Sequence, residues 1–356
     1  HRVLVIGATR PAHPRLLTDR HIHVKSLHWT AVLGDNGAVI FNDESARAQG
    51  PFSSFSREHW KKLAARTPLP LTDEDISQLA SLGDPIDMNE VDAIYRPLCA
   101  LLQVYIQGRY LRARARADFL EEDAPVTPFV IGIAGSVAVG KSTVARLLQL
   151  LLSRSPHTPR VDLVATDGFL LPNAVLEERG ILARKGFPES YDRGALLNFV
   201  ASVKAGISPL QVPVYSHVTY DIRPDKFTTI EHPEVLIVEG LNVLQPPRTH
   251  PGGLGLAVSD YFDFSIYVDA REDDIEQWYV DRFAQLRSTS FQREDSFFRT
   301  YAGLSDSEAE ATARMVWHAI NLPNLYENIL PTRERATLIF TKGADHRVES
   351  LHLRKE

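Results

Sequence analysis

The chain has 356 residues, of which 44% are hydrophobic and 24% are charged, and its formal net charge is −6. This composition is ordinary for a globular protein and argues against a strongly basic nucleic-acid scaffold. The single cysteine, Cys99, excludes an intrachain disulfide. No apolar run reaches the ~18 residues of a membrane span, and the N-terminus shows no apolar signal core. We therefore expect a cytoplasmic protein that binds neither nucleic acid nor membrane.

The first 48 residues differ from the rest of the chain and hold five of its thirteen histidines. Residues 1–10 resemble the first strand of a nucleotide-binding unit, but Pro11 and Pro14 follow where a helix should begin. We therefore expect residues 1–50 to form a mobile extension. The remaining residues, 51–356, are predicted to form the main domain.

A helical subregion is predicted for residues 51–124. Residues 56–64 and 72–80 open with Ser or Thr followed by acidic residues, as helix N-termini do. Residues 89–120 predict one long helix with a kink at Pro97. The rest of the main domain, residues 125–356, is predicted to be the catalytic core.

The core begins with the most informative segment of the chain, a G-x-x-x-x-G-K-S pattern from Gly135 to Ser142. A short apolar run predicts a strand over 129–134, and residues 144–152 predict a helix. Glycines between a strand and a helix let backbone N–H groups surround phosphate oxygens, and the helix N-terminus adds positive potential. Lys141 can reach the β- and γ-phosphates, and the Ser142 hydroxyl can bind Mg²⁺. The predicted phosphate-binding residues are Gly135, Ser136, Val137, Ala138, Val139, Gly140, Lys141, Ser142 and Thr143.

Four more short, β-branched segments predict strands separated by helices or loops, at residues 161–166, 235–239, 263–268 and 336–341. This spacing predicts an α/β fold, a P-loop NTPase-type parallel sheet flanked by helices. Ligands of such sheets gather at the carboxyl ends of the strands.

Two carboxylates follow strands at that edge. Asp167 is a candidate for the carboxylate that orients an attacking hydroxyl, although a turn aspartate before Gly168 is the simpler alternative. Glu239 ends an apolar strand where a Mg²⁺-linked carboxylate belongs, and a buried salt bridge is the alternative.

Two later segments carry aromatic and basic side chains. Tyr215, His217 and Tyr220 lie close together in what, by itself, is an edge strand with ordinary amphipathic aromatics. Tyr279 and Arg282 are spaced i, i+3 and share a helix face. Arg282 could be a surface cation or could stabilise the charge of a phosphoryl transition state.

The ordered motifs resemble those of bacterial type I pantothenate kinases over some 300 residues. They lie at residues 135–143, 166–169, 184–191, 213–217, 238–245 and 328–335. The resemblance implies ATP- and Mg²⁺-dependent phosphorylation of pantothenate, the first step of coenzyme A biosynthesis, with feedback inhibition by coenzyme A. It also implies a homodimer.

The resemblance further implies a role for each matching residue. Asp167, Lys141 and Arg282 would be catalytic, Ser142 and Glu239 would hold Mg²⁺, and His346 would lie near the adenine. The pantothenate pocket would contain Tyr215, His217, Tyr220, Tyr279, Tyr301 and Asn321. Arg146 and His217 would act in regulation by coenzyme A.

Two other functions remain as alternatives. A related kinase of uridine or of a sugar phosphate would share the phosphate loop and Asp167, but residues 185–191 and 213–217 fit it poorly. A non-enzymatic ligand sensor would be expected to lack Lys141 or Asp167, and both are present.

Overall fold

The computed structural model describes residues 50–64, 71–72, 74–76, 86–123, 127–247 and 255–355. It also gives the backbone of four two-residue strands, β1 (Val32–Leu33), β2 (Val39–Ile40), β9 (Thr249–His250) and β10 (Gly253–Leu254). The chain divides into two units, His1–Gly50 and Pro51–Glu356. In the first unit, β1 pairs antiparallel with β2. The prediction that residues 1–50 are mobile concerns residues that lie almost entirely outside the described part of the chain.

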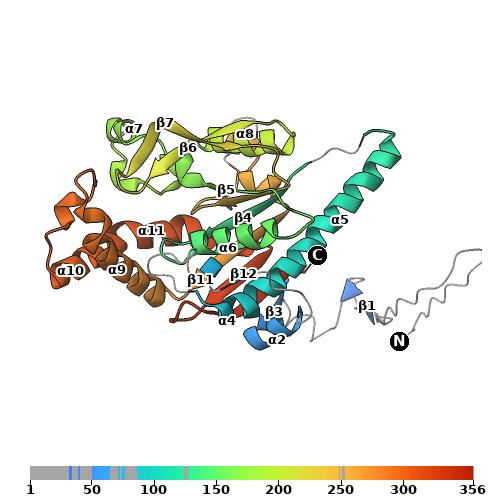
Figure 1. Cartoon of the computed structure of the whole chain (residues 1–356), viewed down its shortest axis with the longest axis horizontal. Coiled ribbons are helices and arrows are strands. Elements are labelled where there is room, and N and C mark those ends of the chain that lie inside the picture. Colours follow the sequence, from blue (N-terminus) through green and yellow to red (C-terminus); the bar gives the residue numbers. More distant parts are fainter. Residues whose placement is uncertain are drawn as a thin grey trace, which may run out of the picture. The chain divides into compact units, whose positions relative to one another are not determined.

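A seven-stranded sheet in the order β3-β13-β12-β11-β4-β8-β5 forms the centre of the second unit (Figure 1). Its strands are β3 (Phe52–Ser56), β4 (Phe129–Gly135), β5 (Val161–Ala165), β8 (Val235–Glu239), β11 (Phe264–Ala270), β12 (Leu338–Lys342) and β13 (Val348–Arg354). The five strands from β12 to β5 run parallel, whereas β13 and β3 are antiparallel to their neighbours. The predicted α/β class with a parallel sheet is confirmed.

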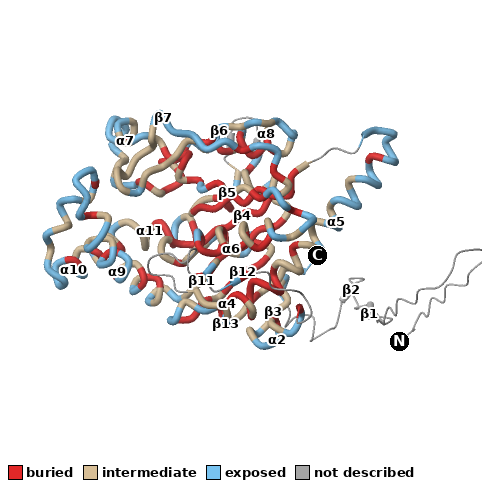
Figure 2. The backbone as a smooth tube through the Cα atoms, in the orientation of Figure 1, coloured by how far each residue is buried: buried red, intermediate tan, exposed pale blue. Residues whose placement is uncertain are grey.

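The parallel strands form the core of this unit, as the red tube in Figure 2 shows. All seven residues of β4 and all five of β8 are buried. Central parallel strands are covered on both faces, which is why these segments read as unbroken apolar runs. Helix α6 (Lys141–Ser153) packs against β4, β5 and β8 through the apolar face formed by residues such as Val144, Leu147, Leu148 and Leu151.

The strands predicted at 129–134, 161–166, 235–239, 263–268 and 336–341 all form, within two residues at each end. The antiparallel pair β13 and β3 was not predicted. The segment 213–220 does not join the main sheet. It forms β6 (Leu210–Ser216), which pairs antiparallel with β7 (Asp221–Ile230) in a separate ribbon.

The helical subregion also forms as predicted where it is described. Helices α2 (Arg57–Lys62), α4 (Met88–Glu90) and α5 (Arg96–Leu120) are present, and residues 74–76 are helical. A π-helical turn, Val91–Tyr95, joins α4 to α5. Pro97, the second residue of α5, closely follows this π-helical turn, so the helix departs from α-helical geometry beside a proline that has no N–H to donate.

The remaining helices are α7 (Asn173–Glu178), α8 (Arg193–Lys204), α9 (Glu272–Ser288), α10 (Asp306–Val316) and α11 (Leu322–Asn324). Helices α9 and α10 pack together to one side of the sheet (Figure 1). Within the part of the chain that the structure describes, no helix is both long and apolar enough to cross a bilayer.

Candidate active site

The phosphate loop joins β4 to α6 and has a backbone that few side chains can adopt. Gly135, Ala138 and Gly140 have φ angles of 144°, 59° and 92°, in the region that favours glycine. A Cβ atom on Gly135 would lie 2.5 Å from the carbonyl oxygen of Val268, so the loop can pass β11 only because this residue is glycine. The loop leads into the N-terminus of α6, whose free N–H groups favour an anion.

Lys141, the first residue of α6, is the buried cation of this loop. Its side chain donates a hydrogen bond from Nζ to the backbone oxygen of Ser136 at 2.7 Å. Burial lowers the pKa of Lys141, the carboxylates of Glu239 and Asp167 oppose this effect, and the guanidinium of Arg282 adds to it. Four residues predicted for the site, from α6, β8, the turn after β5 and α9, are therefore close enough to act on one another's charge.

Glu239 ends β8 beside Ser142. The Ser142 hydroxyl donates to Glu239 Oε1 at 2.8 Å, and Glu239 is only 9% exposed. Burial raises the pKa of the Glu239 carboxyl, and the neighbouring Lys141 ammonium opposes the rise. A hydroxyl and a carboxylate are the hard oxygen donors that Mg²⁺ takes when substrate phosphates complete its shell. This pair fits the predicted metal ligands. Among the described residues, no group of three or more His, Cys, Asp or Glu side chains gathers as in an all-protein metal site.

Asp167 lies in the 3₁₀ turn Thr166–Phe169 at the carboxyl end of β5. The Tyr191 hydroxyl donates to Asp167 Oδ1 at 3.5 Å, and His217 Nε2 lies 4.0 Å from Oδ2. A Cβ atom on Gly168 would lie 2.4 Å from the carbonyl oxygen of Pro213. The absence of a side chain at Gly168 thus lets strand β6 approach, and the approach places aromatic residues beside Asp167.

These aromatic residues come from β6 and from the turn that follows it. The ring of Tyr215 lies 5.1 Å from His217 and 6.3 Å from Tyr220. Tyr220 has a positive φ of 52° and packs edge-on against Phe298 at 4.8 Å. Side chains alternate along an extended chain, so Tyr215 and His217 point to the same side. The turn at Tyr220 brings the ring of Tyr220 to that side as well, so the Tyr215 ring contacts both of the other predicted side chains.

The other predicted substrate residues come from α9, from the 3₁₀ turn Arg299–Tyr301 before α10 and from the segment after α10. Burial raises the pKa of Tyr279, and a side-chain hydrogen bond with Asn321 opposes the rise. Tyr301 stacks on Phe298 at 6.2 Å and lies 5.7 Å from Phe283. Tyr301 therefore connects with Tyr220 through Phe298. The structure brings together all six residues predicted for the substrate pocket.

Lys185 was not predicted as a site residue, yet its ammonium lies against the rings of Tyr215 and Tyr220. It is 7% exposed. Its ammonium donates to Asn173 Oδ1 and to the Tyr220 carbonyl oxygen, both at 2.5 Å, and sits 4.3 Å from the centre of the Tyr220 ring. Burial lowers the pKa of Lys185 to about 8, against the attraction of Asp221 and Asp167. The one signal in the sequence was a lysine before Gly186, inside a segment with family resemblance.

His346 lies in the tight turn between β12 and β13. Its φ is 66°, and its ring stacks on Trp278 of α9 with centroids 4.1 Å apart and planes 22° apart. Lys342 lies at the start of the same turn, and its Nζ donates to the backbone oxygen of Val139 in the phosphate loop at 3.1 Å. The turn that carries His346 is thus tied to the phosphate loop, which is compatible with the predicted place near the adenine.

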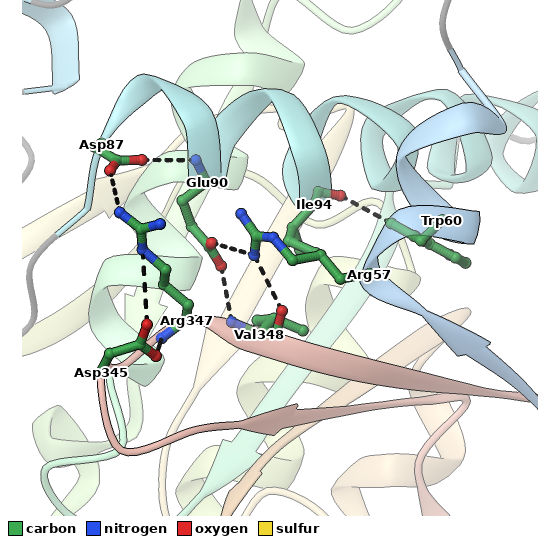
Figure 3. A network of polar contacts seen from close by, with 8 residues as sticks. All are labelled: Arg57, Trp60, Asp87, Glu90, Ile94, Asp345, Arg347 and Val348. Carbon is green, nitrogen blue, oxygen red and sulfur yellow. Dashed lines mark hydrogen bonds and ion pairs between the residues drawn. The ribbon is translucent and has the colours of Figure 1, made fainter.

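A polar network holds the other side of this turn against the helical subregion (Figure 3). Glu90, which is 4% exposed, accepts from Arg57 Nη1 at 2.5 Å and from the backbone N–H of Val348 at 3.0 Å. Arg347 Nη2 pairs with Asp87 Oδ2 at 2.7 Å. Residues of α2 and α4 therefore fix the start of β13 and with it the turn of His346.

Arg146 lies one turn into α6, where its Nε donates to the Ser142 backbone oxygen at 3.2 Å. Its side chain is half-buried and close to the phosphate loop. Nothing in these contacts separates a regulatory role from that of an ordinary helix cation, so the predicted role in regulation stays a prediction.

Comparison with known proteins gives three kinds of match. Residues 130–292 match the model of the phosphoribulokinase/uridine kinase family. A pantothenate kinase of Paenarthrobacter aurescens is 56% identical over 306 residues, which cover 86% of this chain and 95% of the relative. A pantothenate kinase of Leifsonia xyli subsp. xyli is 56% identical over 324 residues, or 91% of this chain and all of the relative. Among solved structures, a D-glycerate 3-kinase from Cryptococcus neoformans is 12% identical, with a TM-score of 0.48 over 70% of this chain and 97% of that chain.

Proposed function

The chain belongs to the pantothenate kinase family, and we propose that it transfers the γ-phosphoryl group of ATP to the primary hydroxyl of pantothenate, the first step of coenzyme A biosynthesis. The observation that carries this proposal is the convergence on Asp167. The buried Lys141 of the phosphate loop and the Lys185 ammonium among the aromatic rings both lie close enough to Asp167 to be attracted by its charge, and the Tyr191 hydroxyl donates to Asp167 Oδ1. A kinase needs its nucleotide site and its acceptor site to meet at such a carboxylate.

In the proposed reaction, the pantothenate hydroxyl lies between Asp167 and the γ-phosphate. Its oxygen bonds to the γ-phosphorus as the bond from that phosphorus to the bridging oxygen of ADP breaks, and Asp167 accepts the hydroxyl proton. Lys141 and Arg282 stabilise the charge on the transferred group, and Mg²⁺ held by Ser142 and Glu239 would neutralise the phosphate oxygens. Positioning and charge neutralisation supply most of the catalysis, so Asp167 needs no unusual basicity.

The same proposal assigns the binding residues. Residues 135–143 bind the phosphates of ATP, and His346 lies against the adenine. Pantothenate is held by Tyr215, His217, Tyr220, Tyr279, Tyr301 and Asn321, with Lys185 added from the structure. An ammonium flanked by aromatic rings and hydroxyls suits an acceptor that carries a carboxylate, an amide and hydroxyls.

We further propose feedback inhibition by coenzyme A in competition with ATP. Both molecules carry phosphates suited to the same loop, and coenzyme A contains the chemical unit that the pantothenate pocket would bind. Arg146 and His217 are the side chains assigned to this contact. Arg146 is supported by its place one turn from the loop, and His217 by its place beside Asp167.

A cytoplasmic homodimer completes the proposal. In Figure 2 the outer half of α5 is mostly exposed, and along its length α5 carries Val104, Leu111 and Phe119 at 65%, 65% and 84% exposure. The spacings of seven and eight residues place them on one side of the helix. Exposed Arg112, Arg114 and Arg116 precede an acidic end, Asp118 to Asp123, so two antiparallel copies would pair basic with acidic segments. Light scattering behind gel filtration should give twice the mass of the 39.9 kDa chain.

The substrate is tested by incubating the protein with ATP, Mg²⁺ and one acceptor at a time. Pantothenate should be phosphorylated, and uridine and sugar phosphates should not. Uridine deserves its place in the panel because residues 130–292 match a family model that includes uridine kinases. Turnover of uridine without turnover of pantothenate would overturn the proposed function.

A further inference from the structure

A small cavity of about 20 Å³ lies beside the turn that carries Asp167. Thr166, Tyr191 and Asn242 are among the residues that line it. This volume is enough for one water molecule and too small for an organic ligand.

Two polar atoms of these lining residues have no hydrogen-bond partner among the described residues. They are the hydroxyl oxygen of Thr166 and the amide oxygen of Asn242, and both are shielded from solvent. Thr166 is 2% exposed. Its position is fixed, because a Cβ atom on Gly240 would lie 1.8 Å from Thr166 Oγ1. Buried polar atoms of this kind are normally satisfied by protein or by ordered water, and a water can donate to the amide oxygen while it accepts from the hydroxyl.

The other end of the Asn242 amide points to a different part of the site. Asn242 Nδ2 donates to the carbonyl oxygen of Gly186 at 2.9 Å. Asn324 Nδ2 donates to the same oxygen at 3.1 Å. Gly186 has a φ of 96° and directly follows Lys185, so these two amides fix the loop that presents the Lys185 ammonium to the pocket.

We propose that Asn242 is a positioning residue for both halves of the site. Its amide nitrogen holds the Gly186 carbonyl and with it the loop of Lys185. Its amide oxygen and the Thr166 hydroxyl together hold one buried water, which braces the turn of Asp167. One side chain therefore sets the place of the catalytic carboxylate relative to the pocket cation. The catalytic meaning of this placement rests on the proposed function, whereas the water site does not.

The first test is a crystal structure of the wild-type protein at high resolution. We expect one well-ordered water within hydrogen-bond distance of both Thr166 Oγ1 and Asn242 Oδ1. We also expect the water to be absent from Thr166→Val, which keeps the shape of the side chain and removes the hydroxyl. An ordered wild-type structure without that water would overturn the proposal.

The second test uses enzyme kinetics to separate the two proposed roles of Asn242, which are holding the water and holding the Gly186 carbonyl. Thr166→Val should lower kcat by about 2- to 10-fold, the scale of one net hydrogen bond, and leave the KM for pantothenate within about 2-fold. Asn324→Ala is the matched control, because it contacts the same Gly186 carbonyl but not the cavity. It should raise the KM for pantothenate by about 2- to 10-fold and leave kcat unchanged. Asn242→Ala should change both quantities.

The double variant tests whether Thr166 and Asn242 share one water, because the losses in kcat of the two single variants should then not multiply. The double variant Thr166→Val/Asn242→Ala should have the kcat of Asn242→Ala alone, because the water is already lost. Thr166→Ser keeps the hydroxyl and should restore kcat to near the wild-type value, and thermal unfolding of each variant shows whether it is folded. Independent, multiplicative losses in kcat would overturn the proposal. If the wild-type protein phosphorylates uridine instead of pantothenate, the proposed function is wrong. The crystal structure would still test the water, and kcat with uridine as the acceptor would still test the non-additivity.

Discussion

Lys185 is a buried cation whose charge state can be followed in two independent ways. Burial lowers its pKa from 10.5 to about 8, while in the unfolded chain the amine keeps its ordinary value. Between these two values the unfolded chain binds more protons than the folded one, so the free energy of unfolding rises with pH. For a pKa of 8 folded and 10.5 unfolded, the rise between pH 7 and pH 9.5 is about 2 kcal/mol.

The perturbation is Lys185→Met, which removes the ammonium and keeps most of the side-chain volume. Urea unfolding of both proteins at pH 7 and pH 9.5 isolates the effect of Lys185, because the other titrating groups are common to both. Tyrosines in the unfolded chain, with a pKa of about 10, begin to ionise near the upper end of this range, but they do so in both proteins and cancel in the comparison. Wild type should gain about 2 kcal/mol relative to the variant over this range. If the free energy of unfolding changes by the same amount in both proteins between pH 7 and pH 9.5, the assignment of a charged, buried Lys185 is refuted.

The same titration should appear in catalysis. If protonated Lys185 binds pantothenate, kcat/KM for pantothenate falls above about pH 8 in wild type, because this parameter reports the free enzyme. The groups that face the ammonium are Asp167, Asp221, Tyr215 and Tyr220. In Lys185→Arg the cation stays protonated throughout, so the alkaline fall should disappear even if the overall rate is lower. An unchanged alkaline limb in the arginine variant would assign it to another group.

Four further outcomes are expected. Asp167→Asn should lower kcat by roughly 100-fold or more with ATP binding little changed, measured by steady-state kinetics and nucleotide titration; near-normal kcat would make Asp167 a turn residue. Glu90→Ala should cost about 3 kcal/mol in urea unfolding because it leaves Arg57 without its buried partner, whereas Arg347→Ala at the exposed pair with Asp87 should cost less than about 1 kcal/mol. Arg146→Ala should weaken inhibition by coenzyme A more than it raises the KM for ATP; an inhibition constant equal to that of wild type would contradict this. Removal of the residues before Gly50 should leave activity and melting temperature nearly intact, and a large loss of either would show that the segment docks on the domain.

The features predicted correctly share a local cause. The phosphate loop is recognised from an apolar strand, two glycines and the start of a helix within about fifteen residues, so the local sequence is enough to predict its structure. Asp167 and Glu239 were placed because parallel strands end at one edge of a sheet, and knowing where an apolar run stops is enough to find that edge. The aromatic residues of β6 and α9 were assigned to a substrate site only through family resemblance, because their spacing alone is that of ordinary amphipathic segments, and that assignment stays a prediction.

The features that were missed depend on contacts between distant parts of the chain. Asn324 reaches Gly186 across 138 residues, and His346 meets Trp278 across 68 residues in a turn with positive φ. Neither contact has a local pattern. The edge strands β3 and β13 pair across about 300 residues, and their short, mixed segments carry no strong period. Lys185 had no signal of its own, because a lysine is usually solvated and only the folded loop buries it.

The charges of the site explain why so many unfavourably buried groups are kept. Burial lowers the pKa of both Lys141 and Lys185 and raises that of Glu239. Glu239 and Asp167 attract the Lys141 ammonium, and Asp221 and Asp167 attract the Lys185 ammonium. If ATP binds as proposed, its phosphates would pair with Lys141 in competition with Glu239 and Asp167, and an anionic acceptor would pair with Lys185 in competition with Asp221 and Asp167. The two buried cations are therefore kept, at a cost in solvation, at the places where the proposed substrates carry negative charge.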